Sequence, residues 1–298
     1  MAATTQNPVT SVTPDSAVGG TTRVLKGAPG SRARFRDSFL LHKLLSLTGV
    51  FPIGVFMIQH LLANSYSLRG ETEFNTVVKV FGYLPFVALL EIGLIFAPLL
   101  FHAVYGLLVV AEMQGPGGNV SRYGYARNWL YVLQRWSGVI ALAYIAFHVY
   151  STSIMRRLYE FGAFELSGSV TAHEAGFRAI AYDAMAWRLA DPAYLGFYVL
   201  GITAAVFHFA NGLFNFGIRW GITIGAGAQK ISAFLWASLG VGLLIVGLWT
   251  AINFSAKGQP LRARYQTLNQ LVNAPDETAP ATPAPGAKPA PQDQTPLQ

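Results

Sequence analysis

Long apolar segments alternate with short polar ones along most of the chain, and polar residues are sparse inside each apolar segment. About twenty such residues in a helix, at about 1.5 Å per residue, cross a hydrocarbon core of about 30 Å. The pattern predicts membrane-spanning helices at 38–63, 82–112, 127–155, 192–219 and 229–254. The predicted fold class is therefore an all-α integral membrane protein with five transmembrane helices, a four-helix bundle plus a fifth helix.

Polar tails flank the predicted transmembrane domain, which covers residues 38–254. Residues 1–37 are rich in Thr, Ser, Gly and Pro and have no apolar core, so we expect a flexible tail and no signal peptide. Residues 255–298 end in a run rich in Pro and Ala, which predicts a disordered C-terminal tail. The loop at 156–191 mixes apolar and charged residues, as a surface helix does, and its Trp187 suits the headgroup region.

Composition narrows the chemistry that this chain supports. Of its 298 residues, 52% are hydrophobic and 12% are charged, and none is cysteine. Thiolate zinc sites and iron–sulfur clusters held by this chain are therefore excluded. The net charge of +7 comes from residues that flank the apolar segments, which is unlike the basic stripe of a nucleic-acid binder. Lys and Arg number eleven at one set of flanks and nine at the other, which favours a cytoplasmic N-terminus.

Four of the six histidines lie deep inside four different predicted spans, one in each. They are His60, His102, His148 and His208. Ionisable groups are rare in a membrane interior and usually face a bundle interior or a cofactor. A single imidazole could simply form a hydrogen bond to a neighbouring helix. Four histidines placed one per helix are harder to explain by such hydrogen bonds. A proton relay in a polytopic transporter remains an alternative, although the sequence shows no convincing internal repeat.

The depth of each histidine in its span predicts two pairs. His60 and His148 lie about 21 residues into helices that run outward, so both approach the outer face. His102 and His208 lie about 16–20 residues into helices that run inward, so both approach the inner face. We call these the outer pair and the inner pair, and we expect them to be about 10–20 Å apart along the membrane normal. Two facing imidazoles suit the axial positions of a haem iron, whereas zinc would need further ligands.

Small residues beside the histidines would give a flat macrocycle room. Gly106 and Gly212 each follow a histidine of the inner pair by four residues and share its helix face. Gly49 precedes His60 by eleven residues, which places it at the level of the inner pair. Close helix packing explains each glycine equally well.

Other polar residues are candidates for supporting roles. Arg219, eleven residues beyond His208, is placed to pair with a haem propionate, and Arg135 is a weaker candidate; both also suit snorkelling to headgroups. His42 and His173 are expected to be solvated. Glu91 lies within the second span, where a carboxylate is costly, so it either carries protons to a quinone or is a neutral acid bonded across helices.

Four stretches, in order, resemble the di-haem cytochrome b membrane anchor of bacterial succinate dehydrogenases and the related fumarate reductases. They are LLSLTGVFPIGVFMIQH, LEIGLIFAPLLFHAVYG, RNWLYVLQRWSGVIALAYIAFHVY and LGFYVLGITAAVFHFANGLFNFGIRWGIT. The resemblance covers residues 38–254, and the Pro- and Ala-rich tail departs from the family pattern.

The resemblance implies two b haems as cofactors, with His60 and His148 binding the distal haem and His102 and His208 the proximal one. It implies that Ser46 and Arg219 contact the proximal propionates. It also implies a flavoprotein and an iron–sulfur subunit as partners on the inner face of the bacterial cytoplasmic membrane, and a menaquinone site near the distal haem. Succinate would be oxidised in the flavoprotein. The same scaffold could act as a quinol:fumarate reductase anchor, or as a cytochrome b anchor for another dehydrogenase.

Overall fold

Pro52 divides the first apolar segment into two helices, α2 (Phe39–Val50) and α3 (Ile53–Ser65). Proline lacks a backbone N–H and cannot continue the helical hydrogen-bond ladder, so the chain bends there. The computed structural model describes residues 38–112, 124–154 and 181–272. Within them, α3 ends in a 3₁₀ turn, η1 (Tyr66–Leu68), and the first candidate membrane span runs over Phe39–Leu68.

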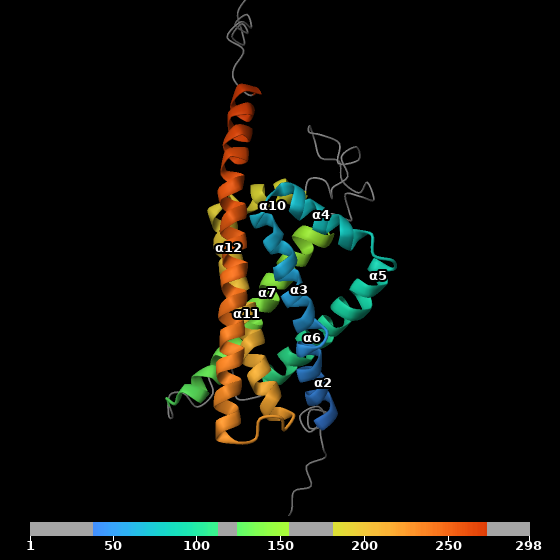
Figure 1. Cartoon of the computed structure of the whole chain (residues 1–298), viewed down its shortest axis with the longest axis vertical. Coiled ribbons are helices and arrows are strands. Elements are labelled where there is room, and N and C mark those ends of the chain that lie inside the picture. The colour runs from blue at the N-terminus through green and yellow to red at the C-terminus, as the bar shows by residue number, and fades with distance from the viewer. Residues whose placement is uncertain (1–37, 113–123, 155–180, 273–298) are drawn as a thin grey trace, which may run out of the picture. The chain divides into compact units, whose positions relative to one another are not determined.

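Two of the other spans contain short π-helical segments. The second span comprises α5 (Val87–Leu90), the π-helical η2 (Glu91–Phe96) and α6 (Ala97–Glu112). The third comprises α7 (Ala126–Val149) and the π-helical η3 (Tyr150–Ile154). The fourth and fifth are the single helices α11 (Pro192–Arg219) and α12 (Ala226–Val272). In Figure 1, α7, α11 and α12 run close together, with α11 packed against both of the others, whereas α5 and α6 run obliquely to them.

The described residues contain helices and no strand, and five helical segments are long and apolar enough to cross a membrane. The predicted all-α class and the five spans are therefore confirmed. The outward surface of α12 supports this reading, because large apolar side chains are exposed along it at helical spacing. They are Ile231, Phe234, Leu235, Val241, Ile245, Trp249 and Ile252. Such a surface suits contact with lipid rather than water.

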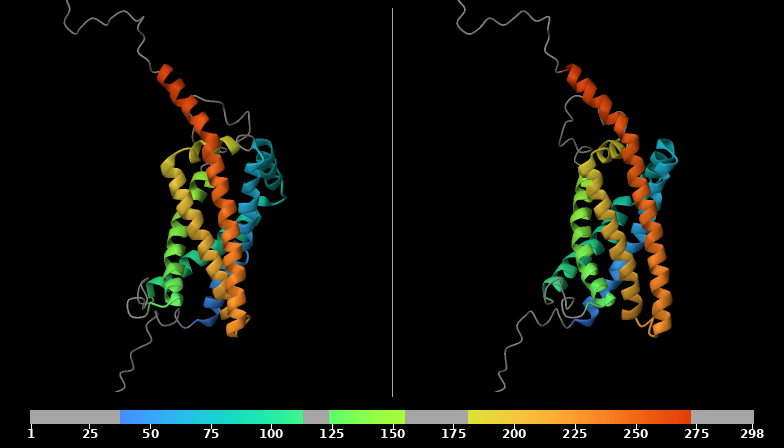
Figure 2. Two further views of the ribbon diagram at one scale, coloured as in Figure 1. Left: turned by 60° about the vertical axis from the view of Figure 1, so that its left-hand side comes forward. Right: turned by 90° about the vertical axis from the view of Figure 1, so that its left-hand side faces the viewer.

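α11 lies at the centre of the bundle and packs against α7 and α12, while α3 packs against α12 (Figure 2). Small residues allow these close approaches. A Cβ on Gly201 of α11 would lie 2.1 Å from Cγ of Tyr144 in α7, and one on Gly247 of α12 would lie 2.9 Å from Ile202. Glycines at such crossings let helices approach closely enough for van der Waals contact to stabilise them.

Two shorter helices, α4 (Glu71–Gly82) and α10 (Ala181–Leu189), lie at the end of the bundle where α3 ends and α11 begins. α4 follows Gly70, whose φ of 136° favours glycine, and α10 precedes α11. Phe74 of α4, Tyr182 of α10 and Phe254 of α12 form an aromatic cluster with ring centroids 5.2–6.0 Å apart. The sequence predicted a surface helix in the 156–191 loop, and α10 occupies its last part; residues 155–180 lie outside the described residues.

α12 continues well past the predicted end of the transmembrane domain at residue 254. Residues 255–272 were expected to begin a disordered tail, but they are helical. A Cβ on Gly258 would lie 1.8 Å from the carbonyl oxygen of Ala186, so this part of α12 packs closely on α10. Tertiary packing therefore extends the helix through the polar sequence, including Pro260. Residues 1–37 and 273–298 lie outside the described residues.

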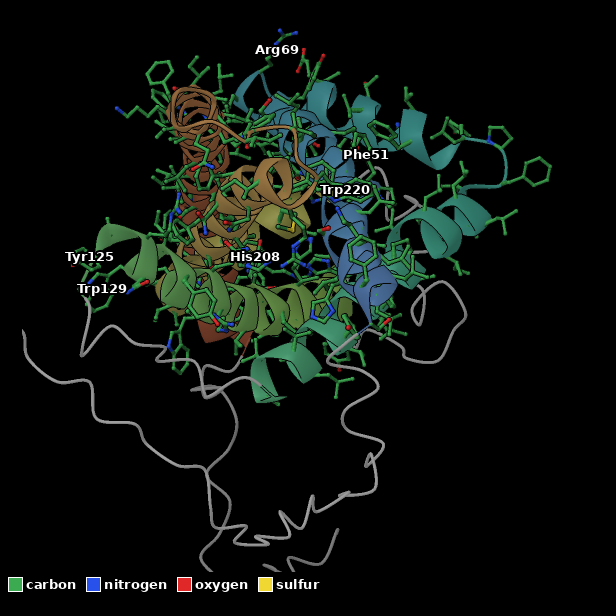
Figure 3. All side chains as sticks on the ribbon, turned by 90° about the horizontal axis from the view of Figure 1, so that it is seen from below. Phe51, Arg69, Tyr125, Trp129, His208 and Trp220 are labelled. Atoms are coloured by element: carbon green, nitrogen blue, oxygen red, sulfur yellow. The ribbon has the colours of Figure 1, made fainter. Side chains whose placement is uncertain are left out.

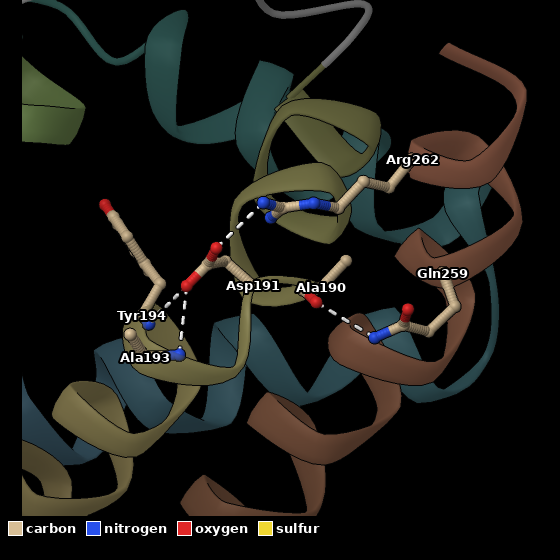
Figure 4. Close-up of polar contacts among 6 residues, drawn as sticks. All are labelled: Ala190, Asp191, Ala193, Tyr194, Gln259 and Arg262. Carbon is tan, nitrogen blue, oxygen red and sulfur yellow. Dashed lines mark hydrogen bonds and ion pairs between the residues drawn. The ribbon is translucent and has the colours of Figure 1, made fainter. Parts of the chain in front are cut away.

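Asp191 ties the start of α11 to the extended part of α12 (Figure 4). Its Oδ1 accepts hydrogen bonds from the backbone N–H groups of Ala193 and Tyr194, at 2.9 and 3.1 Å, so it is the N-cap of α11. Its Oδ2 lies 2.8 Å from Nη2 of Arg262, and Gln259 donates to the carbonyl of Ala190 at 2.9 Å. The hydrogen bond from Tyr194 N–H and the pairing with Arg262 lower the pKa of Asp191.

This lowered pKa predicts a pH-dependent contribution to stability. Because the folded pKa lies below the ordinary value of 3.8, the stabilisation is present above that value and is lost as the pH falls through the folded pKa. Asp191→Asn should therefore lower the melting temperature in detergent at pH 7, and the difference from the wild type should shrink below pH 4. Asp183→Asn on α10 is the control. An equal difference at both pH values would contradict the prediction.

Candidate functional site: two histidine pairs

The outer pair consists of His60 on α3 and His148 on α7. Their ring centroids are 5.8 Å apart and the rings are nearly perpendicular, at 78°. Phe56 packs beside His60, and Tyr144 stacks on His148 at 5.7 Å. The structure thus brings together two histidines that lie 88 positions apart in the sequence.

The inner pair consists of His102 on α6 and His208 on α11. Their ring centroids are 6.1 Å apart, and the rings meet at 88°. Figure 3 shows His208 among the helices, whereas Tyr125 and Trp129 lie at the periphery. The depths of the histidines in their spans predicted both pairs, and the structure brings the same rings together, while their role as haem ligands stays a prediction.

The spacing of each pair fits bis-imidazole coordination of one metal ion. Two metal–nitrogen bonds of about 2 Å, together with the half-widths of two rings, place the ring centroids about 6 Å apart. Among the described residues, no group of three or more His, Cys, Asp and Glu could hold a metal ion. Two imidazoles supply the two axial ligands of a haem, whose porphyrin supplies the other four, so the donor set fits a b haem.

Backbone carbonyls orient both imidazoles of the inner pair. Nδ1 of His102 donates to the carbonyl of Leu45 at 2.9 Å, and Nδ1 of His208 donates to the carbonyl of Gln134 at 3.0 Å. Each bond crosses to a neighbouring helix. A proton held on Nδ1 leaves the Nε2 lone pair for a metal, which is the usual arrangement of a metal-bound histidine.

Contacts along two helices, α7 and α11, place the two pairs at separate levels. Gly138 of α7 contacts the ring of His208, and His148 follows ten residues later. Tyr198 of α11 bonds to His148, and His208 likewise follows ten residues later. At 1.5 Å per residue, these segments separate the two levels by about 15 Å, within the expected range of about 10–20 Å.

Glycines contact the histidine rings, but only one of them was among those singled out in the sequence. A Cβ on Gly49 would lie 2.6 Å from Cε1 of His102, so Gly49 lies at the expected level. Gly138, which the sequence analysis missed, would place a Cβ 2.8 Å from Cε1 of His208. For Gly106 and Gly212, the nearest atoms to a Cβ are on Leu45 and Gln134, at 3.9 and 3.7 Å. Their contact with a macrocycle therefore stays a prediction.

A polar cluster lies where α2 meets the end of α11, next to the inner pair. Nη1 of Arg219 donates to the carbonyl of His42 at 3.1 Å, and Nζ of Lys43 donates to the carbonyl of Arg219 at 2.8 Å. Nε1 of Trp220 donates to Oγ of Ser46 at 3.1 Å, and Lys43 also lies over the Trp220 ring. The structure therefore gathers Lys43, Ser46 and Arg219 around Leu45, whose carbonyl bonds to His102.

The remaining candidate residues lie apart from the two pairs. His42, expected to be solvated, is half-buried and bonds to the hydroxyl of Tyr105 at 3.0 Å. Arg135 lies over the ring of Tyr131. Glu91 begins η2, which packs against α3, the helix that carries His60. His173 lies outside the described residues.

An apolar groove of about 570 Å³ lies between α3 and α4, on the helix that carries His60. Its lining includes Ile58, Gln59, Tyr66, Thr76 and Phe81, and Glu91 is not part of it. This volume, with mostly apolar walls and few polar groups, is typical of a site for a small hydrophobic molecule.

Comparison with known proteins identifies the family. No protein-family model matches the chain. The chain is 40% identical, over 210 residues, to the succinate dehydrogenase cytochrome b558 subunit of Bacillus subtilis (strain 168). The alignment covers 70% of this chain and 94% of that protein. The chain belongs to the succinate dehydrogenase cytochrome b subunit family. The family resemblance seen in the sequence is thus confirmed, and the chain is a multi-pass membrane subunit of the succinate dehydrogenase type.

Several residues that shape the site in this family member were not predicted from the sequence. Gly138, Gln134 and Leu45 hold the rings of the inner pair, and Tyr198 bonds to His148. Gly138 lies ten residues before His148, the same offset that separates Tyr198 from His208. This ten-residue offset was the one signal in the sequence, because a residue ten positions before a histidine on the same helix lies at the level of the other histidine pair.

Proposed function

We propose that this chain is the membrane anchor cytochrome b subunit of a succinate:quinone oxidoreductase and that it holds two b haems, each between two histidines. The observation that carries the proposal is the presence of two imidazole pairs with ring centroids 5.8 and 6.1 Å apart on four helices. In the inner pair both Nδ1 atoms donate to backbone carbonyls, which leaves Nε2 for iron.

The proposal assigns roles to the four histidines, to two backbone carbonyls and to three polar residues at the inner end. His102 and His208 hold the inner group and His60 and His148 the outer one, while the carbonyls of Leu45 and Gln134 fix the inner rings. The bound haems supply one-electron redox chemistry between the partner subunits and quinone. Lys43, Ser46 and Arg219 supply positive charge and hydrogen-bond donors for propionates at the inner end.

The dicarboxylate chemistry belongs to partner subunits in this proposal. A flavoprotein oxidises succinate. An iron–sulfur subunit docks on the inner face of the bacterial cytoplasmic membrane, the face on which the N-terminus of this chain lies. The cysteine-free sequence is consistent with this division, because iron–sulfur clusters need thiolate ligands from a partner. The name of the relative favours succinate oxidation over fumarate reduction, and family membership favours a cytochrome over a transporter.

The direct test of the proposal is haem content. The complex purified from its native membrane should contain two low-spin b haems per copy of this chain, measured as the pyridine haemochrome and normalised to protein. The reduced spectrum should show b-type bands. A preparation of the intact complex with no haem would overturn the proposal and favour a histidine proton relay instead.

We place quinone beside the outer pair, next to α3, with Glu91 of the adjoining η2 as the proton donor; the groove between α3 and α4 is not lined by Glu91 and has no part in this step. A carboxylate that protonates the quinone as it is reduced accelerates turnover by about 100-fold or more. Glu91→Gln should therefore slow succinate:quinone turnover by about that factor and leave both haems in place, whereas Glu73→Gln at the exposed start of α4 should not. Unchanged turnover in Glu91→Gln would remove Glu91 from the mechanism.

A further inference from the structure

The two pairs differ in what holds their imidazoles. Both rings of the inner pair donate to backbone carbonyls, but Nδ1 of His148 lies 3.0 Å from the hydroxyl of Tyr198 on α11. An imidazole that coordinates a metal through Nε2 keeps its proton on Nδ1, so this nitrogen donates and the Tyr198 oxygen accepts. A substitution can remove a side-chain acceptor, whereas no substitution removes a backbone carbonyl.

The Tyr198 hydroxyl belongs to a closed chain of hydrogen bonds. Tyr198 bonds to the hydroxyl of Tyr194, and Tyr194 donates to Oγ of Ser151 at 3.2 Å. Oγ of Ser151 donates to the carbonyl of His148 at 3.3 Å, which returns the chain to the residue where it began. Each donor in this closed chain of hydrogen bonds therefore makes one bond, and each bond polarises the next.

The surrounding helices and side chains hold this chain of hydrogen bonds in place. Ser151 lies in the π-helical segment η3 directly after His148, and Arg188 of α10 donates to its carbonyl at 2.8 Å. Tyr198 is only 3% exposed and stacks on Tyr194, with centroids 5.1 Å apart. Tyr144 packs against both partners, edge-on to the Tyr198 ring and stacked on the His148 ring. Such packing leaves the Tyr198 hydroxyl little freedom to turn away from His148.

We propose that Tyr198 is a positioning residue that lowers the reduction potential of the haem at the outer pair through its hydrogen bond to His148, an inference that rests on the proposed function. An acceptor on Nδ1–H makes the imidazole more basic at Nε2. A more basic axial ligand stabilises ferric over ferrous iron, and second-shell hydrogen bonds of this kind set haem potentials. Tyr194 strengthens the effect because it accepts a hydrogen bond from the Tyr198 hydroxyl and so makes the Tyr198 oxygen a better acceptor.

The test is a redox titration of the assembled complex, followed by optical and electron paramagnetic resonance spectroscopy, with Tyr198→Phe, Tyr194→Phe and a control. Tyr198→Phe should keep both haems, move the midpoint potential of the outer haem to a more positive value and shift its low-spin signal. Tyr194→Phe should give a smaller shift in the same direction. The inner haem should be unchanged in both variants. Tyr105→Phe removes a buried hydroxyl that bonds to His42, outside both pairs, and should shift neither haem.

The outcomes separate the inference from the proposed function. Two haems with wild-type potentials and spectra in Tyr198→Phe would overturn the role of Tyr198 and leave the proposed function standing. Absence of haem from the wild-type complex would overturn both. If Tyr198→Phe loses the outer haem altogether, Tyr194→Phe decides: a positive shift supports the inference, and a wild-type potential overturns it.

Discussion

Replacing His208 by alanine is expected to remove the inner haem completely and to leave the outer haem in place. Within the described part of the chain, the inner pair consists of His208 and His102, with ring centroids 6.1 Å apart, and the proposed haem needs both as ligands. The outer pair is about 15 Å away along α7 and shares neither ligand. The haem content of the purified complex should therefore fall from two to one per chain, and a redox titration should lose the inner component.

His60→Ala is the reciprocal variant and should lose the outer haem alone. His42→Ala is a matched control, because His42 is a half-buried histidine that bonds to Tyr105 and belongs to neither pair; it should retain both haems. Full haem content in His208→Ala would contradict the assignment of the inner pair. Loss of the outer haem in His208→Ala, with the inner one retained, would show that the pairs are assigned to the wrong levels.

The spans and the pairing were predictable because both depend on helix geometry along single segments. Apolar length determines which segments can cross a membrane, and α11 begins and ends at the predicted residues, 192 and 219. A rise of 1.5 Å per residue then converts sequence position into depth, which paired His60 with His148 and His102 with His208. Pairing the histidines by depth did not require knowing which helices pack against one another.

What the sequence analysis missed depends on how helices pack against one another. Gly138 contacts His208, and Tyr198 contacts His148, because α7 and α11 cross at particular faces, which one sequence does not specify. The helix α4 was not predicted for the same reason, since it has an amphipathic sequence whose burial depends on α10 and α12. The C-terminal boundary moved from 254 to Val272 because Gly258 packs on α10.

The glycine beside His208 provides the second test with a large expected effect. Gly138→Ala would place a methyl group 2.8 Å from Cε1 of His208, so the ring must move from the position that Gln134 fixes. Overpacking of this kind costs about 1–3 kcal/mol, which corresponds to a roughly 5- to 140-fold loss of haem affinity at the inner pair. Haem content at limiting haem supply, measured with the inner component resolved by redox titration, should show the loss.

Two other glycines make the test specific. Gly242→Ala on α12 adds a methyl group with no atom within 4 Å and should leave both haems at wild-type content. Gly212→Ala adds one at an ordinary contact distance, 3.7 Å from Nε2 of Gln134, so it tests the sequence-based hypothesis that a macrocycle lies against this face. A greater loss in Gly212→Ala than in Gly138→Ala would support that hypothesis over direct displacement of His208. Wild-type inner haem in Gly138→Ala would contradict the packing of Gly138 on the ligand, because a methyl group at 2.8 Å cannot be accommodated unless the imidazole moves.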